Sequence, residues 1–119
     1  MSIILNARKL INRIYYTWRV RDRAASCGEG LYVGAKSYVT NNTWLSDHVS
    51  FNGMAISGRG KVTIGKYFHS GTGCQIITSF HNYEGDAIPY DTSFVHKDVC
   101  IGECVWLGNN VIMSTVENR

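Results

Sequence analysis

The chain has 119 residues, 45% of them hydrophobic and 18% charged, which is typical of one globular domain and argues against a disordered chain. Its net charge of +3 originates in the first 23 residues, where six Lys and Arg accompany one Asp, and this local excess argues against a general nucleic-acid-binding surface. No apolar run approaches the ~18 residues that span a bilayer, and arginines interrupt the start where a signal peptide is apolar, so we expect a cytoplasmic protein.

The first expected element, over residues 1–24, is a basic amphipathic helix. Apolar side chains recur there at three- and four-residue steps, which places them on one helical face with arginines on the others. The set consists of Ile4, Ala7, Ile11, Ile14, Tyr15 and Trp18. We expect this face to cap the first coil of the repeats that follow, because an uncapped end exposes strand edges. The alternative is a peripheral contact of the basic helix with an anionic membrane.

From Val33 the sequence repeats about every six residues. It divides into VGAKSY, VTNNTW, LSDHVS and FNGMAI, resumes at Ile64 with IGKYFH and SGTGCQ, and resumes at Val95 with VHKDVC, IGECVW and LGNNVI. The first place of most units is apolar, and the fifth is usually small or apolar: Ser37, Thr43, Val49, Ala55, Phe68, Cys74, Val99, Val105 and Val111. Two inward places in six predict a short strand and a turn, so that three strands make one triangular coil and coils stack at ~4.8 Å.

Four cysteines occur, at positions 27, 74, 100 and 104. They do not form the pair of CxxC knuckles that is typical of structural zinc sites. We expect all four to be reduced thiols, with metal binding as a minor alternative.

The segments IGKYFHSGTGCQIITSFHNY and IGECVWLGNNVIM, together with the interruption between them, resemble the hexapeptide-repeat acyltransferases. The similarity is closest to the branch of galactoside, maltose, xenobiotic and surface-polysaccharide O-acetyltransferases, and it covers roughly residues 31–113. It implies a left-handed parallel β-helix over residues 25–113 with a protruding loop at about 79–94. It also implies a homotrimer that transfers an acetyl group from acetyl-CoA to a saccharide hydroxyl, with surface-polysaccharide biosynthesis as its context.

His81 stands near the start of the interruption ITSFHNYEGDAIPYDTSF. The resemblance implies that the loop after it reaches a neighbouring subunit, so that His81 is the catalytic residue in a cleft between subunits. A neutral imidazole, with an ordinary pKa near ~6.5, accepts the proton of a sugar hydroxyl that attacks the thioester and then donates it to the departing CoA thiolate. Without the surrounding motif, His81 would be interpreted as a solvated loop histidine.

Trp106, in CVWLG, occupies the sixth place of its unit, which faces away from the core. The resemblance implies that it binds the pantetheine arm of CoA, and packing in the trimer interface is the alternative. For the saccharide acceptor the resemblance implies a contact from Asn52. The loop residues Tyr83 and Glu84 offer hydrogen-bonding and stacking groups suited to a sugar. No metal is expected.

The sequence departs from the family pattern after LGNNVIM, where residues 114–119 read STVENR in place of PGV and further IG hexapeptides. We expect a natural short form, a fragment or the product of a disrupted reading frame. The missing coils usually help to hold the far part of CoA, so binding of CoA depends on which of these is correct.

Two other classes of function stay open. One is a metal-dependent β-helix enzyme of the carbonic anhydrase type, which needs three histidines that converge on zinc. His48, His69, His81 and His96 lack the close HxxxxH pair of such enzymes. The other is a non-catalytic β-helix that acts as a structural or assembly subunit, an alternative that the short end favours.

Overall fold

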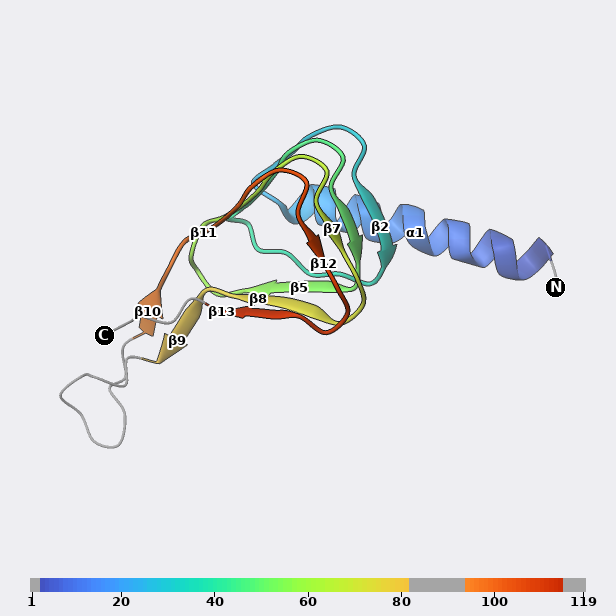
Figure 1. Ribbon diagram of the computed structural model, residues 1–119. Helices are drawn as coiled ribbons and strands as arrows, with labels where there is room; N and C mark the ends of the chain where they lie inside the picture. The colour runs from blue at the N-terminus through green and yellow to red at the C-terminus, as the bar shows by residue number, and fades with distance from the viewer. Residues whose placement is uncertain (1–2, 82–93, 115–119) are drawn as a thin grey trace.

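The computed structural model describes residues 3–81 and 94–114, apart from the side chains of His81 and Phe94. These residues are mostly strand, and one helix, α1 (Ile3–Arg23), precedes the strands (Figure 1). The expected all-β fold with an N-terminal helix is therefore confirmed. In this part of the chain, no helix is long and apolar enough to cross a bilayer.

Most strands belong to three parallel sheets, which the chain visits in a fixed order on each turn. The first sheet consists of β1 (Ser26–Cys27), β3 (Thr43–Leu45), β6 (Val62–Ile64) and β11 (Val99–Ile101). The second consists of β2 (Tyr32–Ala35), β4 (Ser50–Asn52), β7 (His69–Ser70) and β12 (Trp106–Leu107). The third consists of β5 (Met54–Ser57), β8 (Cys74–Ile77) and β13 (Ile112–Ser114).

The register of these sheets explains the six-residue period. Ser26 pairs with Trp44, eighteen residues further on, and eighteen residues are three units of six. Each unit therefore forms one side of a coil, and Figure 1 shows the three-sided outline that results. Successive coils hydrogen-bond to one another along all three sides, as in any parallel ladder.

Alternate strand residues point into the coil and form its core. The buried residues at the two predicted inward places are Val33, Ser37, Val39, Thr43, Leu45, Val49, Phe51, Ile64, Phe68, Ser70, Cys74, Val99 and Ile101. The rings of Phe51 and Phe68 meet edge to face, with centroids 6.0 Å apart. The inward places predicted from the repeat are confirmed at these positions.

The corner between the first and second sheets is built from residues with positive φ. Gly30, His48, Tyr67 and Cys104 have φ of 72°, 59°, 61° and 59°, and each directly precedes an inward residue. The left-handed conformation turns the chain sharply, and it is costly for residues other than glycine. His48 and Tyr67 lie in successive coils at this corner, where their rings stack at 5.1 Å. His48 is thus part of a corner of the coil.

The prediction that Ala55 points inward is wrong. Met54 and Ile56 are buried in its place, whereas Ala55 is half-buried. The physical reason is a shorter corner between the second and third sheets, where Gly53 has a φ of +111°. This conformation strongly favours glycine. Because the corner is shorter, the residues that point inward come one position earlier in the sequence than the repeat predicts.

The prediction that the repeat resumes at Val95 is also wrong. Val95 belongs to β10 (Phe94–His96), which pairs antiparallel with β9 (Ser79–His81). These two strands form the base of a hairpin that leaves the three-sided coil between β8 and β11. The coil resumes only at Val99, which pairs with Val62.

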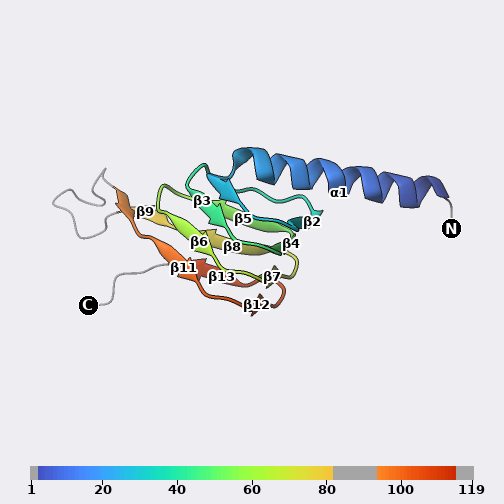
Figure 2. The same cartoon turned by 90° about the horizontal axis from the view of Figure 1, so that it is seen from above.

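The helix contacts the first coil through a different face from the one predicted. Val20 is buried in the core, Tyr16 packs against that core, and Thr17 Oγ1 accepts the backbone N–H of Val33 at 3.1 Å. The predicted capping residues are more than half exposed at Ile4, Ile11, Ile14, Tyr15 and Trp18. The 21-residue helix is about 30 Å long, and Figure 2 shows its N-terminal half extending past the coils. That half has no coil beneath it to cover.

The last coil that the structure describes is less buried than the preceding ones. Val105, Leu107 and Val111 were predicted to point inward, and they are half-buried. Their strands or turns lie at the ends of the sheets, where the described residues supply neighbours on one side only. Incomplete stacking is the reason for this difference from Val49 and Phe68.

Candidate functional site

The base of the hairpin that carries His81 is firmly held. Thr78, directly after β8, is fully buried, and its hydroxyl donates to the carbonyl of Ser57 at 2.9 Å. The same oxygen accepts the N–H of Gly60 at 3.0 Å, and the Thr78 carbonyl accepts the N–H of Lys97 at 2.9 Å. The coil thus fixes the point from which the hairpin projects. His81 ends the outgoing strand three residues later.

The structure describes the backbone of His81 and not its side chain. In the hairpin His81 pairs with Phe94, and Phe80 pairs with Val95. The backbone of His81, the residue predicted to act as general base, therefore lies outside the coil and beside the returning strand. Tyr83 and Glu84, predicted to contact the acceptor, lie outside the described residues.

The returning strand carries a second histidine, His96, whose pairing the sequence prediction missed. Ser79 pairs with His96, and the Ser79 hydroxyl is hydrogen-bonded to His96 Nδ1. The Ser79 oxygen also accepts the backbone N–H of Arg59 at 2.8 Å. The signal that would have revealed this pair is antiparallel pairing of TSFH with FVHK across the interruption.

Trp106 lies on the outer face of the second sheet. Strand β12 pairs in parallel with β7, which places Trp106 opposite His69, and the two rings meet edge to face with centroids 5.6 Å apart. The indole is 76% exposed, in agreement with its predicted outward place. The exposed indole beside an imidazole is an apolar surface that a ligand or another chain can cover.

The Asn52 side chain links successive coils. Its Nδ2 donates to the carbonyl of Ser70 at 3.1 Å in the next coil. Its Oδ1 faces Gly34 in the preceding coil, where an added Cβ would lie 2.5 Å from that oxygen. Asn52 ends β4, at the opposite end of the third sheet from the hairpin. One chain therefore does not bring Asn52 and His81 together.

The four cysteines are free thiols. Cys74 is buried, Cys27 is half-buried, and Cys100 and Cys104 are exposed. Burial raises the pKa of the Cys27 thiol, an effect that Arg21 opposes and Asp47 reinforces. Within residues 3–81 and 94–114, no group of three or more His, Cys, Asp or Glu residues is arranged to hold a metal ion.

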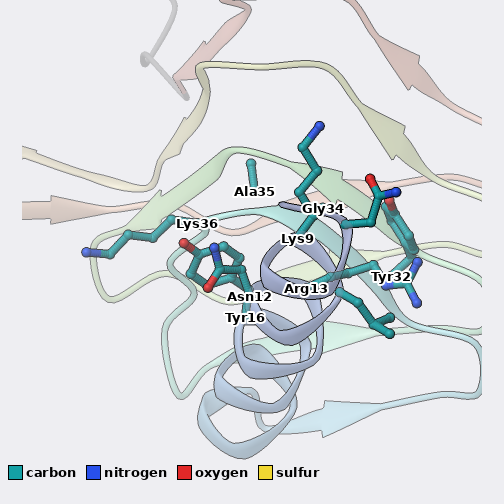
Figure 3. A pocket seen from close by; sticks show the side chains of 10 residues that line it. Lys9, Asn12, Arg13, Tyr16, Tyr32, Gly34, Ala35 and Lys36 are labelled. Atoms are coloured by element: carbon teal, nitrogen blue, oxygen red, sulfur yellow. The ribbon is translucent and has the colours of Figure 1, made fainter. Parts of the chain in front are cut away.

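A pocket of about 550 Å³ lies between α1 and β2. Its lining contains the basic residues Lys9, Arg13 and Lys36 and no acidic residue. Figure 3 shows the ammonium groups of Lys9 and Lys36 pointing in different directions, and the Arg13 guanidinium lies over the Tyr32 ring, 5.4 Å from its centroid. Because these cations diverge, the pocket does not present them to a single anion.

Comparison of the chain with models of protein families, with curated proteins and with solved structures found no match.

Proposed function

We propose that the chain forms a left-handed parallel β-helix, assembles as a homotrimer, and transfers an acetyl group from acetyl-CoA to a saccharide hydroxyl. The proposed general base is His81, and the proposed context is the biosynthesis of a surface polysaccharide. The resemblance of the repeats to the hexapeptide acyltransferases supports this choice among the functions of coiled β proteins.

The observation that carries the proposal is the position of the interruption. Elsewhere in the described coils, a residue pairs with one seventeen to twenty positions later, as Ala35 does with Asn52 and Met54 with Cys74. Val62 pairs with Val99, thirty-seven positions later, so the chain departs from the coil for about the length of one turn. His81 lies on the outgoing strand of that departure. A regular scaffold with one anchored projection is a common way to build a catalytic site on a fixed frame.

The chemistry assigned to His81 needs no acyl-enzyme intermediate. The imidazole accepts the proton of the acceptor hydroxyl as the oxygen bonds to the acetyl carbonyl carbon, and it donates that proton to the thiolate as the C–S bond breaks. General-base assistance of this kind contributes typically ~10²- to 10⁴-fold to the rate. Positioning of the two substrates and stabilisation of the oxyanion supply the remaining acceleration.

Acetyl-CoA supplies the activated acetyl group, and Trp106 is the residue proposed to orient it. The exposed indole offers a flat apolar surface on the outer face of β12, and His69 supports one edge of it. Desolvation of such a ring by the pantetheine arm is favourable because it removes apolar surface from water.

Assembly is part of the proposal because one chain separates its site residues. Asn52 and His81 lie toward opposite ends of the third sheet. In a cyclic trimer each interface brings the hairpin of one copy beside a different region of its neighbour, so a complete site forms between copies.

Acetyl transfer from acetyl-CoA to a panel of saccharides tests the proposal directly. The wild-type chain is expected to release CoA in the presence of one class of acceptor. His81→Ala is expected to lower kcat by ~10²- to 10⁴-fold. His96→Ala is the matched control on the facing strand, and it is expected to retain most of the activity. Loss of activity in His96→Ala with full activity in His81→Ala would show that the wrong histidine has been assigned.

The alternative function is a non-catalytic assembly subunit, and one observation favours it. Trp106 and Ile112 are 76% and 60% exposed on the outer faces of the last described coil. Exposed apolar surface of this kind is also typical of a protein–protein contact. A folded chain that neither binds acetyl-CoA nor transfers acetyl groups would favour this alternative.

A further inference from the structure

The projecting helix carries a continuous apolar face that the described coils do not cover. We define the apolar stripe as Ile4, Ala7, Ile11, Ile14, Tyr15 and Trp18. Every member is exposed, and Ile4 reaches 76% and Trp18 56% exposure. The stripe runs over four turns of α1 (Ile3–Arg23). An uncovered apolar face of this length indicates a surface that becomes covered when the protein functions.

The stripe and the coil-facing residues lie on different sides of the helix. Thr17 and Val20 contact the first coil, through the hydrogen bond to Val33 and burial in the core respectively. At 100° per residue, Thr17 and Val20 lie about 260° and 200° around the axis when Trp18 is at 0°. Ile11 lies about 20° from Trp18 on the same scale. Tyr15, at one edge of the stripe, also lines a pocket between α1 and residues 36–39, whereas the rest of the stripe points away from the body of the protein.

The charge of α1 complements an anionic surface. The first 23 residues contain six basic residues and Asp22, a net charge of +5, whereas the whole chain carries +3. Helical neighbours four residues apart lie side by side, so Arg19 borders the stripe at Tyr15. Arg8 lies seven residues before Tyr15 and borders the same edge. Asp22, the single acidic residue, follows Trp18 in the last turn.

We propose that α1 binds the surface of an anionic lipid bilayer through the apolar stripe. The stripe enters the boundary between headgroups and acyl chains, and Arg8 and Arg19 reach the lipid phosphates from its edge. Trp18 and Tyr15 suit this depth, because aromatic side chains with a polar group are favoured where one end is apolar and the other is wet. The helix lies in the surface plane, since its basic residues are costly to bury in hydrocarbon.

A lipid surface fits the helix better than a second copy of the same helix does. Two copies of α1 would bring net charges of +5 together, and like charges at close range oppose association. The helix also lies across the first coil and not along the direction of stacking (Figure 2). A flat surface beside that end of the stack is reached without interference from the coils, which extend to the other side of α1.

This proposal does not rest on acetyl transfer, and its test uses the full 119-residue chain. The chain is mixed with vesicles of phosphatidylcholine alone or of phosphatidylcholine with phosphatidylglycerol, and bound protein is measured by co-sedimentation. A variant with Trp44→Phe and Trp106→Phe retains Trp18 as its one tryptophan. We expect the protein to co-sediment with the vesicles that contain phosphatidylglycerol and not with those of pure phosphatidylcholine. On binding, the fluorescence emission of Trp18 is expected to shift to shorter wavelength.

Two double variants assign the binding to the stripe and to its arginines. Ile11→Glu with Ile14→Glu is expected to abolish co-sedimentation, and because both residues are exposed, the circular dichroism of the coils stays unchanged. Arg8→Gln with Arg19→Gln is expected to weaken binding about 10- to 30-fold. Arg59→Gln with Lys66→Gln removes the same charge from exposed positions on the coils, and it is expected to change binding by less than about threefold.

Three results would overturn the proposal. The first is a folded chain that binds neither kind of vesicle. The second is unchanged vesicle binding by the Ile11 and Ile14 double variant, which would place the contact elsewhere. The third is a wild-type assembly that loses mass in lipid-free solution when Ile11 and Ile14 are replaced, which would identify a second copy as the occupant of the stripe.

Discussion

Asn52 and His81 lie beyond opposite ends of the same sheet within one chain. Strands β5 and β8 run in parallel, with Met54 opposite Cys74 and Ser57 opposite Ile77. Asn52 precedes the start of β5, whereas His81 follows the end of β8. Each four-residue strand spans about 10 Å, so the two residues are separated by at least the length of the sheet.

Subunit complementation follows from this separation if the site forms between copies. Chains with Asn52→Ala and chains with His81→Ala are each expected to be inactive, and mixed assemblies regain activity. Random assembly places an intact His81 beside an intact Asn52 at about a quarter of the interfaces, so about a quarter of wild-type activity is expected. The measurement is acetyl transfer after the two variants are denatured and refolded together.

The control for complementation is a mixture of His81→Ala chains with chains that carry both substitutions. No interface of that mixture combines the two intact residues, and no activity is expected. Full activity of Asn52→Ala alone would show that Asn52 only bridges coils, through its hydrogen bond to Ser70, and has no part in the site.

The coils are expected to differ in their tolerance of cavities. Val49 is fully buried and Val105 is half-buried at the same place of the repeat. Val49→Ala is expected to cost about 2 kcal/mol of unfolding free energy, because it leaves a cavity between stacked coils. Val105→Ala is expected to cost less than about 1 kcal/mol, since water reaches that position. Urea unfolding of both variants measures the difference, and equal costs would contradict the incomplete burial of the last coil.

Ser70 provides a case in which removal of a polar group is expected to stabilise. Its hydroxyl is fully buried and has no hydrogen-bond partner in the described part of the chain. Ser70→Ala removes this unsatisfied group and is expected to raise the free energy of unfolding by about 1 kcal/mol.

The matched substitution for Ser70 is Thr43→Val. Thr43 is equally buried, but its hydroxyl oxygen accepts the N–H of Thr40 at 3.2 Å and lies 2.9 Å from the Thr40 hydroxyl. Removal of the Thr43 hydroxyl is expected to lower the free energy of unfolding by about 1 to 2 kcal/mol. Thermal unfolding of the two variants should therefore shift in opposite directions, and a loss of stability in Ser70→Ala would show that its hydroxyl is satisfied.

The attachment of α1 depends on the face that contains Thr17. Thr17→Val deletes the acceptor for the Val33 N–H and leaves that donor unsatisfied, at an expected cost of about 1 to 2 kcal/mol. Trp18→Ala, one position further, is expected to change stability by less than about 0.5 kcal/mol in lipid-free solution because the indole is exposed. A larger loss from Trp18→Ala than from Thr17→Val would show that the stripe, and not the Thr17 face, contacts the protein.

The periodic part of the fold could be predicted because each unit repeats the same two inward places. Phe51 and Phe68 are examples, and both are buried as the period requires. The six-residue period fails at Ala55, because the corner at Gly53 is one residue shorter than the repeat requires. The propensities of the residues on either side of Gly53 do not reveal this shorter corner. It also fails at Val95, where an apolar residue serves an antiparallel hairpin.

The orientation of α1 could not be predicted from its amphipathicity. A strong apolar face usually packs on the nearest core, yet Val20 and the polar Thr17 make this contact. At the site, His81 and Trp106 were chosen from local motifs. The Ser79–His96 pair was missed because it depends on the register of two strands on either side of a long interruption.

We propose that this chain binds acetyl-CoA beside Trp106 and uses it as an acetyl donor. Calorimetric titration of the 119-residue chain with acetyl-CoA tests it most directly, with Trp44→Ala as a control that removes a second exposed tryptophan from another sheet. We predict saturable binding that is weakened at least ~10-fold by Trp106→Ala and is unchanged by Trp44→Ala. No saturable binding by the folded wild-type chain, or equal affinity in Trp106→Ala, would contradict the proposed acetyl-CoA site.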